Sequence, residues 1–119
     1  MWVKSLSECE QKIANDGCVI YEVVHPQNDK LELPYSLAVA EVAGGEASYR
    51  HRLQQSEVYY VLSGCGLMHI DDEQREVSAG DAILIPPLAV QWIENLGTET
   101  LRFIAVVAPP WSAAGDARL

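Results

Sequence analysis

His51–Gly64 reads HRLQQSEVYYVLSG, and the fold of this chain can be inferred outward from it. Leu53 lies two residues after His51, so in a β-strand both side chains point to the same face. The polar run that follows predicts a short turn, after which Glu57 and Tyr59 share one face of a second strand. If both strands belong to one curved sheet, His51 and Glu57 converge inside it. The stretch therefore predicts a β-rich fold with an imidazole and a carboxylate in its interior.

The length and composition are those of one soluble domain. The chain has 119 residues, of which 49% are hydrophobic and 21% are charged, and a domain of this size buries a substantial core. No apolar run approaches the roughly 18 residues that a membrane helix needs. The polar N-terminus lacks the apolar core of a signal peptide. We therefore expect a cytoplasmic protein with no membrane partner.

The charge and the cysteines exclude two further classes of function. A formal net charge of −9 repels phosphate backbones, which proteins bind through clustered Lys and Arg, so nucleic acid is not an expected partner. The three cysteines are Cys9, Cys18 and Cys65. Their odd number and the absence of C-x-x-C spacing argue against both a disulfide framework and a zinc site.

Short β-patterned segments, separated by turn signals, run through most of the chain. A short helix is expected before them, from about Leu6 to Ala14, and His25 is expected to be a solvated loop histidine before Pro26. Strands at this spacing predict an all-β barrel or a double-sheet jelly roll. The expected strands are 18–24, 35–42, 58–63, 67–70, 74–77, 82–85, 90–94 and 100–107.

Two motifs in this chain resemble those of the cupin superfamily. The first family motif is G, five residues, H-x-H, three or four residues, E, six residues, G, and it is matched here by Gly45, His51, Leu53, Glu57 and Gly64. The second is G, five residues, P-x-G, two residues, H, three residues, N. It is matched by Gly80, Pro86, Leu88, Gln91 and Asn95.

The resemblance implies a small single-domain cupin that spans residues 1–119. Its fold would be a double-stranded β-helix, the jelly-roll barrel of cupins, with a short N-terminal helix. The helix and a first strand would occupy residues 5–24, the barrel core about 35–108 and a C-terminal tail 109–119. Trp111 is expected to anchor that tail by packing on the barrel.

The chain departs from the family at two of the four usual metal ligands. The second histidine falls on Leu53 and the third on Gln91, so His51 and Glu57 remain and Gln91 can add only a neutral oxygen. The resemblance thus implies a weak site for a divalent metal (Fe, Mn, Ni or Zn) on His51, Glu57 and Gln91. The alternative is a metal-free polar pocket lined by the same residues with Leu53 and Tyr59.

A second alignment of the first motif stays open, because the family permits four residues before the glutamate. In that register Gly44, Arg50 and Arg52 take the motif positions, and the pocket would present guanidinium groups, which bind carboxylate or phosphate. The His51 register is preferred because it keeps the apolar Leu53 on the same face.

Two classes of function follow from the resemblance. In the first, a small polar organic molecule is held in the barrel with a weakly bound metal that supports oxygenase, isomerase or lyase chemistry. In the second, the chain is a binding module for a sugar or a carboxylate, without metal or turnover. A homodimer is expected in either case, because a small sheet has an unpaired edge and the strand Tyr35–Val42 is strongly apolar.

Overall fold

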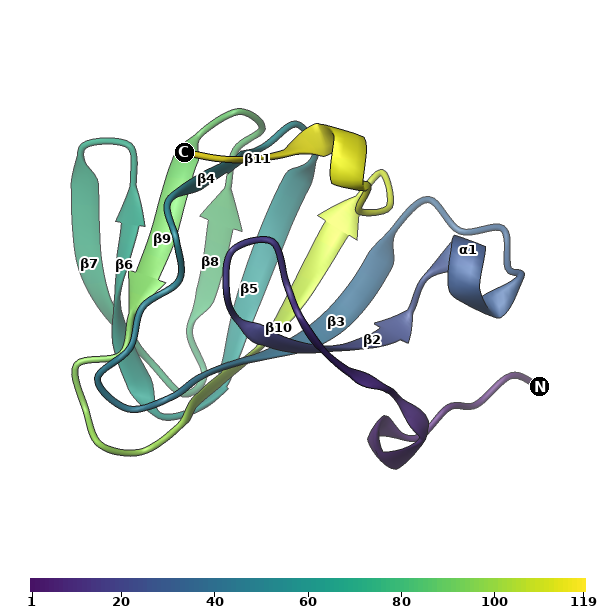
Figure 1. The fold of residues 1–119 in the computed structure, drawn as a ribbon, viewed down its shortest axis with the longest axis horizontal. Coiled ribbons are helices and arrows are strands. Elements are labelled where there is room, and N and C mark those ends of the chain that lie inside the picture. Colours follow the sequence, from purple (N-terminus) through teal and green to yellow (C-terminus); the bar gives the residue numbers. More distant parts are fainter.

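The computed structural model describes residues 1–119 and folds them into two antiparallel β-sheets (Figure 1). The six-stranded sheet contains β1 (Gln11–Ile13), β2 (Val19–Val24), β3 (Ser36–Val42), β10 (Leu101–Ala108), β5 (Ser56–Ser63) and β8 (Ala82–Ile85), in this order. The five-stranded sheet contains β11 (Asp116–Arg118), β4 (His51–Leu53), β9 (Val90–Glu94), β6 (Cys65–Ile70) and β7 (Glu73–Ser78), also in order.

One hydrophobic core joins the inner faces of the two sheets. Val61 and Phe103 enter it from the six-stranded sheet, and Met68 and Ile93 enter it from the five-stranded sheet. Side chains alternate in burial along β9, as expected for a strand with one face on a core. The expected all-β fold is confirmed, and every expected strand is present within two residues of its expected ends.

The turn between β5 and β6 is tighter than the sequence suggested. The expected strands 58–63 and 67–70 leave residues 64–66 for the turn, but β6 already begins at Cys65. Gly64 makes this possible with a φ of 83°, a left-handed conformation that other residues rarely adopt. A Cβ atom at this position would lie 2.8 Å from the Thr100 carbonyl oxygen. The chain therefore reverses here on a single glycine.

The expected helix from Leu6 to Ala14 is wrong. A single 3₁₀ turn covers Leu6–Glu8, and the chain then enters strand β1, which pairs with β2 in an antiparallel hairpin. The Ala14 amide donates to the Cys18 carbonyl at 2.8 Å and closes this hairpin. The local structure is set by pairing with β2, a tertiary contact that local helix propensity does not include.

The segment after β2 also differs from expectation. Pro26–Asp29 forms one turn of helix, α1, with proline at its first position, where the missing amide costs nothing. His25 caps this turn and is buried, not solvated. Its Nδ1 accepts from the Gln27 amide at 3.1 Å, and its Nε2 donates to the Trp111 carbonyl at 2.8 Å. Both ring nitrogens of His25 therefore have partners.

The C-terminal segment is more ordered than a tail. A 3₁₀ turn, Ala113–Gly115, leads into β11, which extends the five-stranded sheet by pairing with β4. Trp111 donates its amide to the Ser36 hydroxyl at 2.9 Å, so the segment is fastened across the end of β3. No helix in the structure has the length and apolar character that crossing a membrane requires.

Candidate functional site

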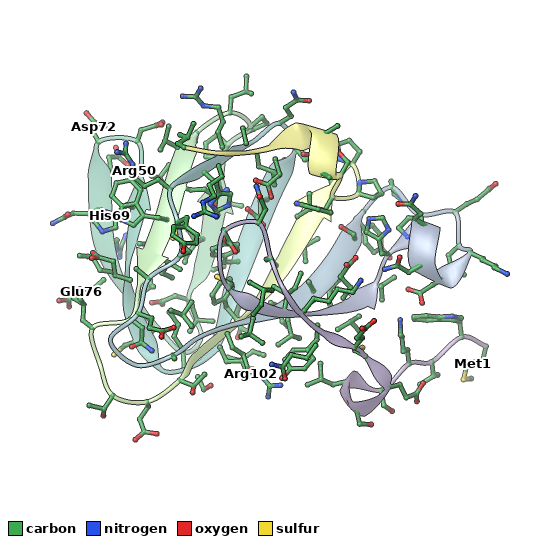
Figure 2. The ribbon with its side chains drawn as sticks, in the orientation of Figure 1. Met1, Arg50, His69, Asp72, Glu76 and Arg102 are labelled. Atoms are coloured by element: carbon green, nitrogen blue, oxygen red, sulfur yellow. The ribbon has the colours of Figure 1, made fainter.

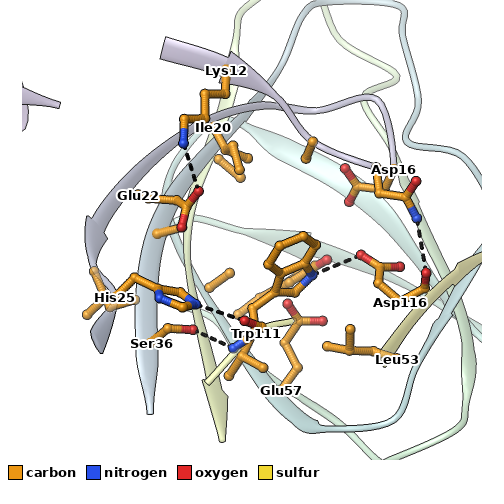
Figure 3. Close-up of a pocket in the computed structure, with 18 of the residues that line it drawn as sticks. Lys12, Asp16, Ile20, Glu22, His25, Ser36, Leu53, Glu57, Trp111 and Asp116 are labelled. Atoms are coloured by element: carbon orange, nitrogen blue, oxygen red, sulfur yellow. Dashed lines mark hydrogen bonds and ion pairs between the residues drawn. The ribbon is translucent and has the colours of Figure 1, made fainter. Parts of the chain in front are cut away.

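A cavity of about 200 Å³ lies against the inner face of the six-stranded sheet. The β1–β2 hairpin and the C-terminal segment close it from the other sides (Figure 3). Of the residues expected in the pocket, His51, Leu53, Glu57 and Tyr59 line this cavity. Gln91 does not line it, although it touches Glu57 from behind.

Strand β4 points His51 and Leu53 inward and the neighbouring arginines outward. His51 and Leu53 are buried, whereas Arg50 and Arg52 are exposed. The Arg50 guanidinium lies 4.9 Å from the ring centre of Trp92, on the outer side of the sheet (Figure 2). The alternative register, in which Arg50 and Arg52 face the pocket, does not describe this structure, because the two-residue period of β4 is set by its pairing with β9.

A buried chain of hydrogen bonds holds the Glu57 carboxyl in place. The Tyr59 hydroxyl donates to the Gln91 side-chain oxygen at 3.0 Å, and the Gln91 side-chain nitrogen donates to Glu57 Oε1 at 2.9 Å. Gln91 is fully buried, and both ends of its side-chain amide are hydrogen-bonded to protein groups, as buried polar groups normally are. These hydrogen bonds orient Glu57 towards the cavity and leave its second oxygen without a protein donor.

The environment of Glu57 favours its neutral form. The pKa of the Glu57 carboxyl is raised from 4.5 to about 8: burial raises it most, the hydrogen bond from Gln91 partly offsets this, and the nearby carboxylates of Asp16 and Asp116 add to the rise. Desolvation dominates because a carboxylate loses most of its hydration inside the sheet. Near neutral pH this residue can therefore donate as well as accept a proton.

His51 presents one free nitrogen to the cavity. Its Nδ1 lies 3.1 Å from the Tyr49 carbonyl oxygen, which only accepts, so the hydrogen of the neutral ring is on Nδ1. Nε2 then carries the lone pair. The nearest charged atom to it is Asp16 Oδ2 at 3.8 Å, which is too far for a hydrogen bond. The residue is only 4% exposed, so this acceptor can be satisfied only from within the cavity.

Three residues that sequence reasoning missed complete the cavity. Asp16 comes from the β1–β2 hairpin, and Trp111 and Asp116 come from the C-terminal segment. The Trp111 indole donates to Asp116 Oδ2 at 2.9 Å (Figure 3). In the sequence Asp16 lies in an Asn-Asp-Gly turn and Asp116 near the end of the chain, so neither carries a local signal of function.

These donor groups do not fit a resident metal of the kind the family resemblance implies. The Gln91 oxygen, the expected third ligand, already accepts from Tyr59, and Leu53 offers no ligand atom. Among the residues of this chain, no three His, Cys, Asp or Glu side chains are grouped so that they could hold a metal ion. Of the expected ligands only His51 and Glu57 are left, which is fewer than the three protein ligands of typical catalytic zinc sites.

A second histidine cluster lies on the outer face of the five-stranded sheet. We call it the outer cluster; it consists of Arg50, His69, Trp92 and Glu94. His69 Nε2 lies 2.6 Å from a Glu94 oxygen, and the ring stacks on Trp92 with centroids 4.1 Å apart. The groups of the outer cluster thus bind one another, and none of them lines any of the three main cavities.

Asn95, at the last position of the second motif, has a structural role. Its side-chain nitrogen donates to the carbonyls of Val42 and Glu99, and its oxygen accepts from the Gly97 amide at 3.0 Å. These bonds fix the connection between β9 and β10 and bring it against the end of β3. The residue is buried and does not line the cavity.

Taken together, the cavity can bind a small molecule and can exchange protons with it. His51 Nε2 accepts a hydrogen bond, and Glu57 can donate or accept. Leu53, Tyr59 and Phe103 supply apolar surface around these polar atoms.

Comparison with known proteins agrees with this fold. The family model described as "Cupin domain" matches residues 38–107. An uncharacterized protein of Methanocaldococcus jannaschii is 42% identical over 101 residues, which cover 84% of this chain and 80% of that protein.

Solved structures show the same arrangement of strands. A cupin 2 conserved barrel domain protein from Salinispora arenicola superposes with a TM-score of 0.78 at 21% identity, over 96% of this chain and 91% of that one. A predicted oxalate decarboxylase from Thermotoga maritima gives 0.78 at 21% identity, over 91% and 99%. Oxalate decarboxylase from Bacillus subtilis gives 0.81 at 24% identity, over 96% of this chain but 30% of that one. The match to residues 38–107 and the fold together show that this chain belongs to the cupin family.

Proposed function

We propose that this cupin holds one small polar organic molecule in the cavity, in contact with His51 and Glu57. One observation carries the proposal: each of these side chains is more than nine-tenths buried, and each has a polar atom on the cavity without a protein hydrogen-bond partner. A buried polar group without a partner costs about 1–3 kcal/mol. A ligand that bonds to both atoms recovers that free energy.

The size of the cavity limits the ligand. Its volume of about 200 Å³ corresponds to roughly six or seven water molecules at about 30 Å³ each. Drug-sized ligands occupy pockets of about 300–1,000 Å³. The proposed ligand is therefore a compact molecule with few heavy atoms, held by apolar contacts with Leu53 and Phe103 and oriented by the two polar side chains.

A screen of small polar compounds by ligand-observed NMR tests this proposal. The His51→Leu variant removes the free nitrogen while keeping the site apolar, and His69→Leu makes the same change in the outer cluster. We expect compounds that bind the parent to lose binding in His51→Leu and to keep it in His69→Leu. Equal binding by both variants would place the ligand elsewhere.

A second candidate function is proton-transfer catalysis, as an isomerase or a lyase acts. It is supported by the raised pKa of Glu57 beside the His51 acceptor, since carboxyl groups that titrate near neutral pH are typical of acid–base sites. A bound compound whose C–H hydrogen exchanges with D₂O in the parent but not in Glu57→Gln would support turnover. Binding of the compound without this hydrogen exchange would indicate that the protein binds it without catalysing proton transfer.

The metal site expected on His51, Glu57 and Gln91 stays a prediction that the bond from Tyr59 to the Gln91 oxygen argues against. The oxalate decarboxylases share the fold of this chain at 24% identity or less in the comparisons above, so decarboxylation is one lyase reaction to test and is not transferred as a function. Elemental analysis of the purified protein gives the answer directly. An iron or manganese stoichiometry near one would support metal-dependent chemistry, and a metal content near zero would support the metal-free site.

A homodimer is proposed as well. The outer face of the six-stranded sheet exposes Tyr60 and Leu62 on β5 and Leu84 on the edge strand β8, the last with 75% exposure. Exposed apolar patches of this kind mark interaction sites, and a symmetric homodimer is the commonest assembly of soluble proteins. Light scattering should give the mass of a dimer, and Leu84→Glu should shift it towards monomer. A monomeric parent at micromolar concentration would contradict the proposal.

A further inference from the structure

We infer that the molecule bound in this cavity is a small cation with N–H donors, a primary amine or a guanidine, rather than a carboxylate. The inference rests on the proposed function, because it names the ligand class of the same cavity. It is carried by a count of donors and acceptors on the cavity wall. Most hydrogen-bond donors on the wall are already bonded to other protein groups, whereas several acceptors have no partner.

The free acceptors come from four elements of the chain. His51 Nε2 and the second oxygen of Glu57 have no protein donor, as described above, and the Glu57 oxygen is an acceptor when the carboxyl is ionised. Asp116 Oδ1 is a buried atom with no hydrogen-bond partner of any kind. Asp16 uses Oδ1 to accept from the Cys18 amide at 3.0 Å, which leaves Oδ2 facing His51 at 3.8 Å. All four residues line the one cavity.

The donors on the wall are directed to protein groups instead. The Tyr59 hydroxyl donates to Gln91, and the Trp111 indole donates to Asp116 (Figure 3). His25 gives its ring N–H to the Trp111 carbonyl at 2.8 Å. Lys12 is the one lysine or arginine on the wall, and it pairs with Glu22 at 3.3 Å. A ligand therefore meets acceptors in the cavity and few free donors.

The charges on the wall agree with this count. The wall carries four acidic side chains, Asp16, Glu22, Glu57 and Asp116, against the single lysine. A bound carboxylate would face like charges in a partly dry site, which is unfavourable. An ammonium group placed between Asp16 and Asp116 would relieve the repulsion between their carboxylates.

A matched set of probes tests the ligand class. Butylamine, butanol and butyrate share one carbon skeleton and differ in charge, and their binding to the full chain can be followed by protein-observed NMR. We expect butylammonium to bind at least about tenfold more tightly than butyrate, since the ammonium group would meet carboxylate acceptors and butyrate would meet like charges. Tighter or equal binding of butyrate or butanol would overturn the cationic class and leave the proposed function standing. If butylamine does not bind, the inference fails, whereas the proposed function fails only if the wider screen of polar compounds also finds no ligand.

Neutralising single carboxylates shows whether the cavity makes the contact. Asp116→Asn keeps an oxygen that can accept from the Trp111 indole, and Asp16→Asn keeps one for the Cys18 amide. Asp72→Asn, at the tip of the β6–β7 hairpin far from the cavity, is the control with the same change in net charge (Figure 2). We expect either cavity variant to weaken butylamine binding at least about fivefold, within the usual range for a hydrogen bond to a charged group, and the control to leave it unchanged. An equal loss in cavity and control variants would overturn the inference, because the attraction would then be due to net charge.

Discussion

The cavity and the outer cluster contain the same kinds of side chain, but their polar atoms differ in whether they have hydrogen-bond partners. In the outer cluster, His69 Nε2 lies 2.6 Å from Glu94 and the ring stacks on Trp92. In the cavity, the charged atom nearest to His51 Nε2 is Asp16 Oδ2, at a distance of 3.8 Å. The residues of the outer cluster satisfy one another, whereas those of the cavity leave acceptors free.

This difference shows that residue types alone do not identify a site. Both places combine a histidine, a carboxylate and an aromatic ring, and both histidines lie in or next to the five-stranded sheet. What separates them is whether each polar atom has a partner when it is buried. The variants below change one side of the comparison and use the other side as the control.

The largest effect is expected from the pH dependence of Glu57. Folding raises its pKa from 4.5 to about 8, so the folded protein binds the proton more tightly than the unfolded chain between these values. The free energy of unfolding should therefore fall as the pH rises through this window. Glu57→Gln removes the fall, and at about pH 9 it should be more stable than the parent by on the order of 5 kcal/mol, from about 1.4 kcal/mol per unit of pKa difference.

Urea unfolding at a series of pH values measures this effect. Glu94→Gln, in the outer cluster, is the control and should retain the slope of the parent. A parent whose stability does not fall between about pH 5 and pH 8 would contradict the assigned environment of Glu57.

The next largest effect is expected from Gln91, which links Tyr59 to Glu57. Gln91→Leu keeps the side-chain size but leaves both partners buried without their bonds, so it should lower the free energy of unfolding by about 2–4 kcal/mol. Glu94→Ala, on the same strand, breaks the contact with His69 at a position whose side chain is 34% exposed. That loss should stay below about 1 kcal/mol. Equal losses in chemical denaturation would contradict the comparison.

A smaller change is expected when a ligand is restored at Leu53. Leu53→His places a second imidazole on the inner face of β4 beside His51 and should raise zinc or nickel affinity at least about tenfold. Isothermal titration with an exposed control, Arg52→His, measures the gain. If Leu53→His remains folded and binds metal no better than the control, the assignment of position 53 to the family's ligand set is wrong.

The smallest effect is expected in the outer cluster itself. Arg50→Ala removes the guanidinium that lies 4.9 Å from the Trp92 ring centre, and exposed contacts of this kind contribute about 0.5–1 kcal/mol. Ligand binding in the cavity should not change. A loss of ligand binding in Arg50→Ala, measured by the same NMR assay, would mean that the two regions are not independent.

The sequence predicts the fold because its strands carry strong local signals. The two-residue alternation in His51–Leu53 and in the strand of Glu57 correctly predicts which side chains face inward. Gln91 lies next to Glu57 and donates a hydrogen bond to it. Residues 11–13 do not form the expected helix, since their pairing with β2 is a tertiary contact. Asp16 and Asp116 could not be found, because only the folded chain brings these two distant residues to one cavity.

The position of Asp16, Trp111 and Asp116 has a consequence for how such proteins diverge. All three lie outside residues 38–107, the segment that the family shares, yet they line the cavity together with residues from inside it. The shared framework supplies the pocket, and the two flanking segments supply much of its acidic character. Relatives can therefore inherit the same framework and acquire different ligands through changes in their flanks.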